Sequence, residues 1–135
     1  MVDGLGVPLA LVASGANVHD VKLLPATLDQ VAMAPPGAGP QNLCADAGYH
    51  GASAWHAVVE RGDRPHIRPR REEAHAKRTQ PGYKARRWVV ERTHSWLNRF
   101  RKLLVSFEKT AASYVALLSL AAAMICWRQT ISIYG

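Results

Sequence analysis

Runs of hydrophobic residues set between polar ones predict short strands in this chain. Residues 8–13 are apolar and follow Asp3-Gly4, a dipeptide typical of hairpin turns, so we expect a buried strand there. The apolar run 42–45 has the length and composition of a central strand, and 64–68 predicts a further one. The arm before the hairpin turn is only two residues long, so we expect the folded domain to begin upstream of this sequence.

Hydrophobic residues at helical spacing predict helices between and after these strands. Asp20 is expected to cap a helix over 21–33, and Ser53 to cap a short helix that ends at Gly62. Two more helices are expected towards the carboxyl end of the chain. Strands that alternate with helices in this way predict an α/β layered domain.

A helix over 86–104 would have two contrasting faces. Its apolar face would hold Val89, Thr93, Trp96, Phe100 and Leu103. Its opposite face would hold Arg87, Glu91, His94, Asn98 and Lys102, with Arg92, Arg99 and Arg101 on the flanks. Glu91 is the only acidic residue in this segment. A lone carboxylate among cations is either half of an Arg87–Glu91 ion pair on a solvated face or a functional group.

Positive charge is concentrated in the second half of the 135-residue chain. Residues 61–104 carry 14 lysines and arginines against four acidic residues, a net charge of +10, whereas the whole chain carries +7. Such a concentration predicts a polyanionic partner, with nucleic acid first and an anionic membrane surface second. Residues 69–82 are polar and basic, and we expect them to form an exposed, mobile loop.

The carboxyl-terminal segment is long and apolar. Residues 110–127 contain no charged side chain, which is near the lower limit for a membrane span, but the segment is rich in alanine and has several hydroxyl groups. We expect a buried helix, to about residue 128, that packs on the sheet rather than a membrane helix. Cys44 and Cys126 lie in apolar segments and are expected to be buried thiols of a reducing compartment. Neither cysteine has a neighbour at metal-ligand spacing, so a structural zinc site is not expected.

Asp46 stands where open α/β sheets place functional groups. It ends the apolar run 42–45 and opens a turn that contains Gly48 and Gly51. An aspartate that merely forms the turn is the alternative. Phosphodiester chemistry uses divalent cations, and Mg²⁺ prefers carboxylate oxygens, which Asp46 and Glu91 could supply.

Two segments resemble a known family. The run Ala45-Asp-Ala-Gly-Tyr49 resembles the segment around the second catalytic aspartate of insertion-sequence transposases. The run from Arg87 to Leu103 resembles their helix with the catalytic glutamate. The resemblance implies an Asp-Asp-Glu (DDE) transposase with a ribonuclease-H-like fold, whose Mg²⁺ or Mn²⁺ is held by Asp46 and Glu91 as catalytic residues. It also implies a set of DNA-binding residues, which are Tyr49, Arg87, Arg92, Arg99, Arg101 and Lys102.

The chain departs from the family pattern in three places. The helix signature of the family has a tyrosine where this chain has Lys84, with Tyr83 one residue early. Its lysine position holds Asn98, although Lys102 lies one turn further on. The first catalytic aspartate has no match, because Asp3 lies in the hairpin turn. The resemblance therefore predicts a partial catalytic domain that lacks the first strand.

The sequence thus predicts one partial transposase domain over residues 1–135. It comprises strands and a first helix (1–46), a connecting helix and basic loop (47–82), and the Glu91 helix with a C-terminal helix packed on the sheet (83–135). We expect DNA cleavage and strand transfer at element ends only when the chain is joined to its upstream part. The chain is then either the second reading frame of a frameshifted element or a decayed copy.

Two other classes of function remain open. One is a non-catalytic basic DNA-binding module, and the other is a membrane-associated basic protein. The partners implied by the resemblance are double-stranded DNA, the N-terminal part of the transposase and a second copy of the chain, with no membrane. The implied location is the bacterial cytoplasm, at the nucleoid when the protein binds DNA. Since the N-terminus has no basic segment followed by an apolar one, we expect no signal peptide.

Overall fold

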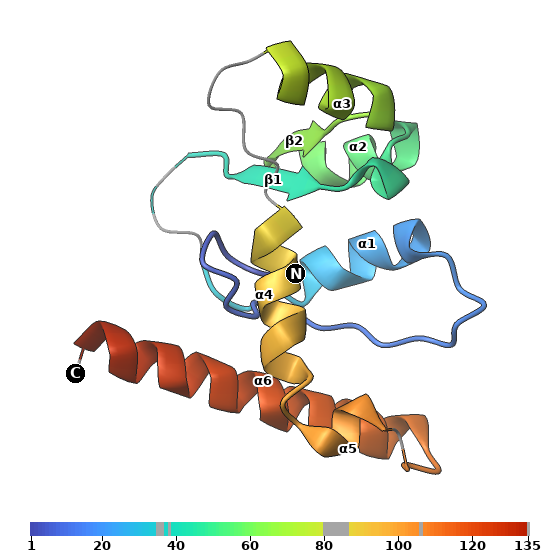
Figure 1. Ribbon diagram of the computed structural model, residues 1–135. Helices are drawn as coiled ribbons and strands as arrows, with labels where there is room; N and C mark the ends of the chain where they lie inside the picture. The colour runs from blue at the N-terminus through green and yellow to red at the C-terminus, as the bar shows by residue number, and fades with distance from the viewer. Residues whose placement is uncertain (35–36, 38, 80–86, 106, 135) are drawn as a thin grey trace. The chain divides into compact units, whose positions relative to one another are not determined.

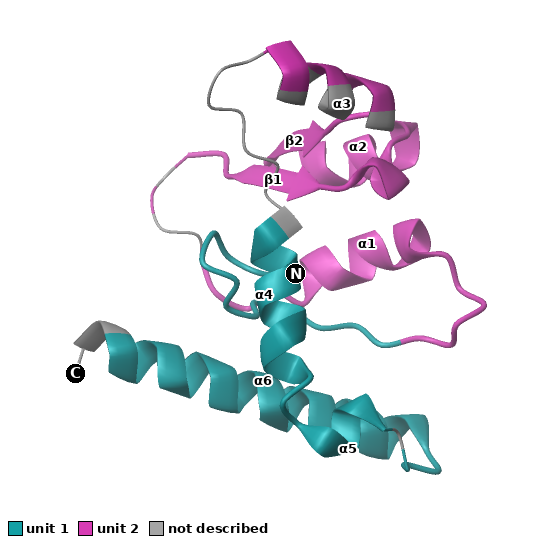
Figure 2. Ribbon diagram, in the orientation of Figure 1, with its two compact units in different colours: residues 1–13, 88–135 teal, residues 14–87 magenta. Residues whose placement is uncertain are grey.

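The computed structural model describes residues 1–34, 37, 39–79, 87–105 and 107–134 (Figure 1). Within these ranges, the side chains of residues 70, 73, 74, 76, 77, 87, 133 and 134 are outside the description. Two compact units divide the chain, and each is described by itself (Figure 2). Unit 1 comprises residues 1–13 and 88–135, and unit 2 comprises residues 14–87.

Unit 2 is a mixed α/β unit around a small parallel sheet. Its strands β1 (Asn42–Ala45) and β2 (Arg64–Ile67) pair in parallel, with Asn42 opposite Arg64 and Ala45 opposite Ile67. Helix α2 (Ala52–Val59) connects them, which makes a strand–helix–strand unit. Both strands lie in the segments where the sequence predicts them, 42–45 and 64–68. The prediction of a mixed α/β fold is therefore confirmed.

Helix α1 (Asp20–Asp29) packs against α2 in the same unit. The side chains buried between the helices and the strands are Leu24, Leu28, Ala54, Ala57 and Val58. Arg61 connects the two helix ends, because its guanidinium contacts the Asp29 carboxylate at 2.6 Å and donates to the carbonyl of Ala57 at 2.7 Å.

Three predicted boundaries in unit 2 are wrong. Helix α1 ends at Asp29 and is capped by His19, whose ring nitrogen accepts from the backbone N–H of Val21. Asp20 instead occupies the first turn, where a carboxylate suits the positive end of the helix dipole. Helix α2 has Gly51 rather than Ser53 as its N-cap.

The basic segment predicted as a loop is a helix over most of its length. Helix α3 runs from Arg70 to Thr79. Arginine, glutamate, alanine and lysine have high helix propensity, and they make up most of this segment. A polar composition excludes a buried core but does not exclude an exposed helix, so the loop prediction was wrong. Tyr83 and Lys84, the two candidates for the family tyrosine, lie outside the described residues.

Unit 1 begins with a tight turn rather than with a long strand. An isolated antiparallel bridge pairs Val2 with Pro8, and Leu9 and Ala10 donate their N–H groups to the carbonyl of Met1. The predicted turn at Asp3-Gly4 is present. The predicted strand over 8–13 is reduced to this single bridge.

The predicted helix over 86–104 is broken. Helix α4 (Arg87–Leu97) and the short helix α5 (Arg101–Leu104) are separated at residues 98–100, where Phe100 is extended with φ −88° and ψ 95°. Val89 and Thr93 are buried on α4 and Glu91 is exposed, so the two faces are as predicted there. Asn98 and Lys102 lie beyond the end of α4, and their placement on one helical face with Glu91 was wrong.

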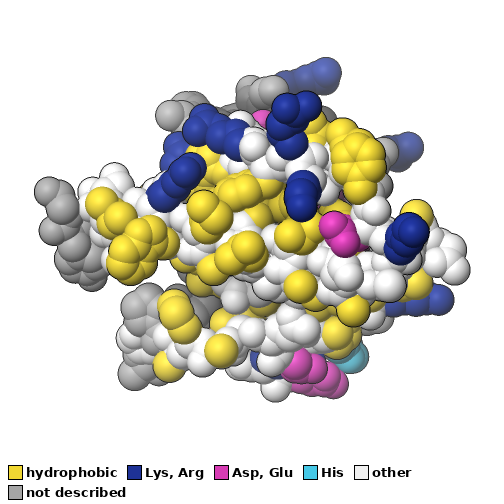
Figure 3. Space-filling model, turned by 90° about the horizontal axis from the view of Figure 1, so that it is seen from below, with side chains coloured by type: hydrophobic (Ala, Val, Ile, Leu, Met, Phe, Trp, Pro, Cys, Tyr) yellow, Lys and Arg dark blue, Asp and Glu magenta, His cyan; other side chains and the backbone are white. Residues whose placement is uncertain are grey.

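The last helix, α6 (Ala111–Tyr134), is longer and more exposed than predicted. Its buried side chains within the described range are Ala121, Ala122 and Ile125, whereas large hydrophobic ones are exposed, among them Leu120 and Trp127. Hydrophobic side chains are also exposed on the face of the molecule seen in Figure 3. Within unit 1 most of α6 is therefore exposed, and its predicted burial against the sheet, which lies in the other unit, stays a prediction. By length and composition alone, residues 111–132 could also cross a membrane, as many core helices could.

The two cysteines differ from the prediction that both are buried. Cys44 is exposed, because alternate side chains of β1 point away from the core. Cys126 is partly buried on α6, with its Sγ 3.5 Å from the carbonyl oxygen of Pro8, and burial raises the pKa of its thiol.

Gly6 is required by the close contact between the opening turn and α4. Its φ of +88° disfavours side chains, and a Cβ there would lie 3.0 Å from the carbonyl oxygen of Val89. We expect Gly6→Ala to lower the free energy of unfolding by about 1–3 kcal/mol. The matched control is Gly4→Ala, since a Cβ at Gly4 would meet no atom within 4 Å. Urea unfolding of both variants measures the difference, and equal midpoints would contradict the expectation.

Candidate functional site

Asp46 is held at the carboxyl end of β1 with its carboxylate exposed. It caps the short 3-10 helix η1 (Ala47–Tyr49), where its Oδ1 accepts the backbone N–H of Gly48 at 2.8 Å. A Cβ at Gly48 would lie 2.9 Å from that oxygen, so a larger residue there would make the Asp46 carboxylate shift. One carboxylate oxygen thus fixes the turn while the side chain faces solvent, so a turn-forming role and a ligand role are compatible.

Tyr49 ends the same turn and is half-buried. Burial raises the pKa of its phenol, and the negative charges of Asp20 and Asp46 raise it further. The phenol therefore stays protonated over the neutral range and can donate a hydrogen bond. Its predicted contact with DNA stays a prediction.

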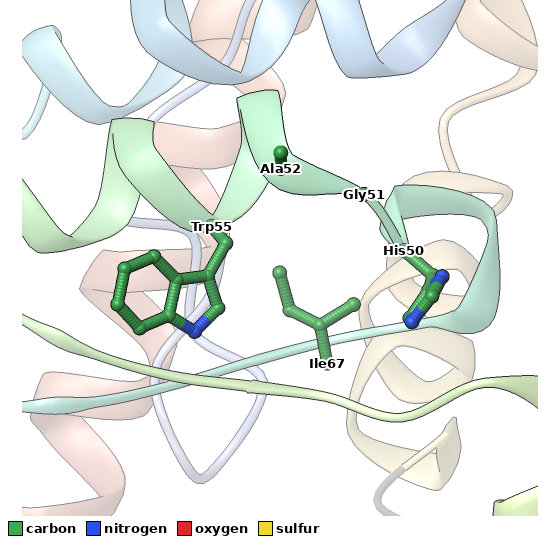
Figure 4. A pocket seen from close by; sticks show the side chains of 5 residues that line it. All are labelled: His50, Gly51, Ala52, Trp55 and Ile67. Carbon is green, nitrogen blue, oxygen red and sulfur yellow. The ribbon is translucent and has the colours of Figure 1, made fainter.

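A shallow pocket lies just after the Asp46 turn. It has a volume of about 260 Å³ and is lined by His50, Gly51, Ala52, Trp55 and Ile67. Trp55 and His50 stand on opposite sides of the hollow, with Ile67 between them (Figure 4). Trp55 is 50% exposed.

Glu91 stands on the exposed side of α4. Val89 and Thr93, two residues away on either side, are buried at 6% and 5% exposure, so the helix is fixed with Glu91 facing solvent. The side chain of Arg87 lies outside the described residues, and the alternative of an Arg87–Glu91 ion pair is therefore not decided. Among the side chains that the structure describes, none forms an ion pair with Glu91.

The predicted DNA-binding cations differ in the contacts that their side chains make. Arg92 lies over the ring of Trp88, 4.7 Å from its centroid, and 5.9 Å from the centroid of Trp96. Its Nη1 also donates to the carbonyl oxygen of Leu5 at 3.4 Å. Arg92 thus has a structural role that its exposed position in the sequence pattern did not reveal. The cations Arg99, Arg101 and Lys102 follow α4 and are exposed.

The carboxylates have the chemistry that a divalent cation needs, but neither unit contains a complete set among its described residues. Mg²⁺ and Mn²⁺ prefer oxygen ligands, which both Asp46 and Glu91 present to solvent. The described residues contain no group of three or more histidine, cysteine or acidic side chains that could hold a metal. Asp46 belongs to unit 2 and Glu91 to unit 1, so the prediction that they converge stays a prediction.

Sequence reasoning missed the contact that holds α4. The hydroxyl of Thr93 donates to the carbonyl oxygen of Gly6 at 2.6 Å, across 87 residues of sequence. Asp3 organises the opening turn, because its Oδ1 accepts the N–H groups of Leu5 and Val7, each at 2.8 Å. The Asp-Gly-Leu-Gly pattern signals such a turn, but nothing local in the sequence signals its partner.

Comparison with known proteins assigns the chain to a family. Residues 1–126 match the transposase DDE domain. A putative transposase for insertion sequence element IS402 from Burkholderia cepacia is 39% identical over 135 aligned positions. That alignment covers 94% of this chain, which spans 60% of the relative's length, and no solved structure matches the chain. The match over nearly the whole chain shows that this protein belongs to the family of insertion-sequence transposases with a DDE domain.

Proposed function

We propose that this chain supplies two of the three acidic metal ligands of an insertion-sequence transposase that cleaves DNA and transfers strands. The observation that carries the proposal is the match over residues 1–126 together with the positions of Asp46 and Glu91. Both carboxylates are exposed, that of Asp46 directly after β1 and that of Glu91 on α4. Family membership implies a ribonuclease-H-like fold. We propose that residues 1–135 form a single partial domain of this fold.

Asp46 and Glu91 would hold Mg²⁺ or Mn²⁺ in this proposal. The bound cation would activate the attacking oxygen and neutralise charge on the leaving oxygen of a phosphodiester. The surrounding cations Arg99, Arg101 and Lys102 would contact DNA phosphates. Tyr49 would donate a hydrogen bond from its protonated phenol, and Arg87 and Arg92 complete the proposed DNA-binding set.

The proposed partners are double-stranded DNA at element ends and targets, the rest of the transposase, and a second copy of the chain. The proposed location is the bacterial cytoplasm, in keeping with the bacterial relative. We further propose that the chain alone is inactive, because its sequence offers no match to the first aspartate.

Mn²⁺ affinity tests the role of the two carboxylates. We expect Asp46→Asn and Glu91→Gln each to weaken Mn²⁺ binding by at least about tenfold, since even residues that only orient ligands change affinity by roughly 10–100-fold. The amide in Asp46→Asn would keep an oxygen to accept the N–H of Gly48, so the turn should persist. Electron paramagnetic resonance of free Mn²⁺ measures the affinity.

Glu60→Gln is the matched control for Glu91→Gln. Glu60 is exposed and lies at the end of α2. Glu60→Gln changes the net charge of the chain by the same amount as Glu91→Gln. Its replacement should leave Mn²⁺ affinity within about twofold. Equal effects of all three substitutions would mean that the Mn²⁺ affinity depends only on the net charge of the chain.

A non-catalytic DNA-binding module is the second candidate function. It is favoured by the concentration of positive charge in residues 61–104, a net charge of +10, which could contact DNA phosphates without a metal ion. Under this alternative, Asp46→Asn and Glu91→Gln leave Mn²⁺ affinity unchanged, and DNA binding proceeds equally well with and without the metal. The same measurement therefore separates the two candidates.

A further inference from the structure

Thr93 and Glu91 are linked through the geometry of α4. Two helical positions differ by about 200° in direction, so side chains two residues apart point to nearly opposite sides. Thr93 is 5% exposed and Glu91 is exposed. Whatever fixes the buried side of α4 at Thr93 therefore also fixes the direction in which Glu91 points.

The opening turn makes that contact with short hydrogen bonds. The hydroxyl of Thr93 lies 2.6 Å from the carbonyl oxygen of Gly6 and 3.2 Å from that of Val89 on its own helix. Arg92 donates to the carbonyl oxygen of the neighbouring Leu5 at 3.4 Å. Two successive carbonyl groups of the turn thus accept hydrogen bonds from two successive side chains of α4.

The opening turn is held by its own hydrogen bonds, so it can fix the rotation of α4 about the helix axis. Asp3 Oδ1 accepts two backbone N–H groups at 2.8 Å, and the N–H of Asp3 donates to the carbonyl oxygen of Val7 at 3.0 Å. Gly6 permits close approach, because a Cβ there would lie 3.2 Å from Thr93 Oγ1. The opening segment is therefore shaped to receive α4 at one rotation.

We infer that the turn of residues 3–7 positions Glu91 for metal binding and that Thr93 is the positioning residue through which it acts. This inference rests on the proposed function, in which Glu91 is a metal ligand. Asp3 then has a defined role without being a ligand itself: it holds the turn that holds the helix. Loss of the Thr93 hydroxyl would leave α4 able to rotate and Glu91 poorly directed.

The test compares Mn²⁺ affinity of three hydroxyl variants of the full chain with the wild type. Thr93→Val keeps the shape of the side chain but loses the donor, Thr93→Ser keeps the donor, and Ser95→Ala removes an exposed hydroxyl from the same helix. We expect about tenfold weaker Mn²⁺ binding for Thr93→Val and near-wild-type binding for the other two. Circular dichroism establishes that each protein is folded at the temperature of measurement.

A role in stability alone would lower the melting temperature of Thr93→Val but leave the Mn²⁺ affinity of the folded protein unchanged, and this result would overturn the inference. If Thr93→Val fails to fold, Asp3→Ala replaces it, because this change loosens the turn but leaves Thr93 in place. Asp3→Asn keeps an acceptor oxygen without the charge and should bind Mn²⁺ as the wild type does, while Asp3→Ala should not. Equal affinity of both Asp3 variants and the wild type would overturn the inference.

Glu91→Gln is measured in the same series. If Glu91→Gln loses Mn²⁺ and the positioning variants do not, the inference fails and the proposed function stands. If Glu91→Gln binds Mn²⁺ as the wild type does, the proposed function fails, and the inference fails with it.

Discussion

The 135-residue chain by itself should show no metal-dependent nicking of element-end DNA. Its sequence offers two of the three expected acidic ligands, and Mg²⁺ requires nearly octahedral placement by its ligands. Loss of one electrostatic group from an active site costs about 10²–10³ in rate, and a missing metal ligand also removes geometric control. We expect a rate at least roughly 10³-fold below that of a complete transposase.

The decisive experiment compares the isolated chain with the same chain joined to a segment that carries the first aspartate on a strand. The joined protein should nick element-end DNA with Mg²⁺ or Mn²⁺, and Glu91→Gln should abolish this activity. A joined protein with the upstream aspartate changed to asparagine is the control, because it restores the sheet without the ligand. Robust nicking by the isolated chain, abolished by Glu91→Gln, would show that two carboxylates suffice.

Binding of the chain to duplex DNA should weaken steeply as salt is raised. Each phosphate neutralised by a cation contributes about 0.9 to the slope of log affinity against log salt. Replacing Arg87, Arg99 and Lys102 together by alanine should therefore reduce the slope by about 2–3. Arg99 and Lys102 are exposed, so their loss should not disturb the fold.

A control with the same change of charge distinguishes local contacts from net charge. Lys22, Lys109 and Arg128 are exposed and lie outside the basic segment 61–104. Their joint replacement by alanine should change the slope by less than about 1, because no phosphate contact is lost. Fluorescence anisotropy at several salt concentrations measures both triple variants. Equal slopes for the two would place the DNA contacts elsewhere.

Local sequence pattern was sufficient for the small sheet and for Asp46. The run Asn42–Ala45 is apolar, short and followed by a glycine-containing turn, and each of these features is local. Asp46 follows the strand directly, so its position at the strand end needed no knowledge of distant contacts. The exposed position of Glu91 followed from helical periodicity, because buried Val89 and Thr93 lie on the opposite side.

The features that the sequence pattern did not predict depend either on competition between helix and loop preferences or on contacts between residues far apart in the sequence. The break at residues 98–100 was missed because the sequence Asn-Arg-Phe contains no glycine or proline and helical spacing continues through it. Helix α3 was missed because charge was taken as a sign of a loop, although its residues favour helix. The Thr93–Gly6 hydrogen bond joins residues 87 apart, so no local pattern could indicate it.

The central claim is that Asp46 and Glu91 reach one cation although 44 residues separate them in the sequence. Fe²⁺ bound in place of Mg²⁺, treated with ascorbate and peroxide, releases hydroxyl radicals that cut the backbone close to the metal. We predict cuts near both residue 46 and residue 91, and both should disappear in Asp46→Asn and in Glu91→Gln. Cuts at only one of these places, or cuts at one that survive loss of the other carboxylate, would contradict the account.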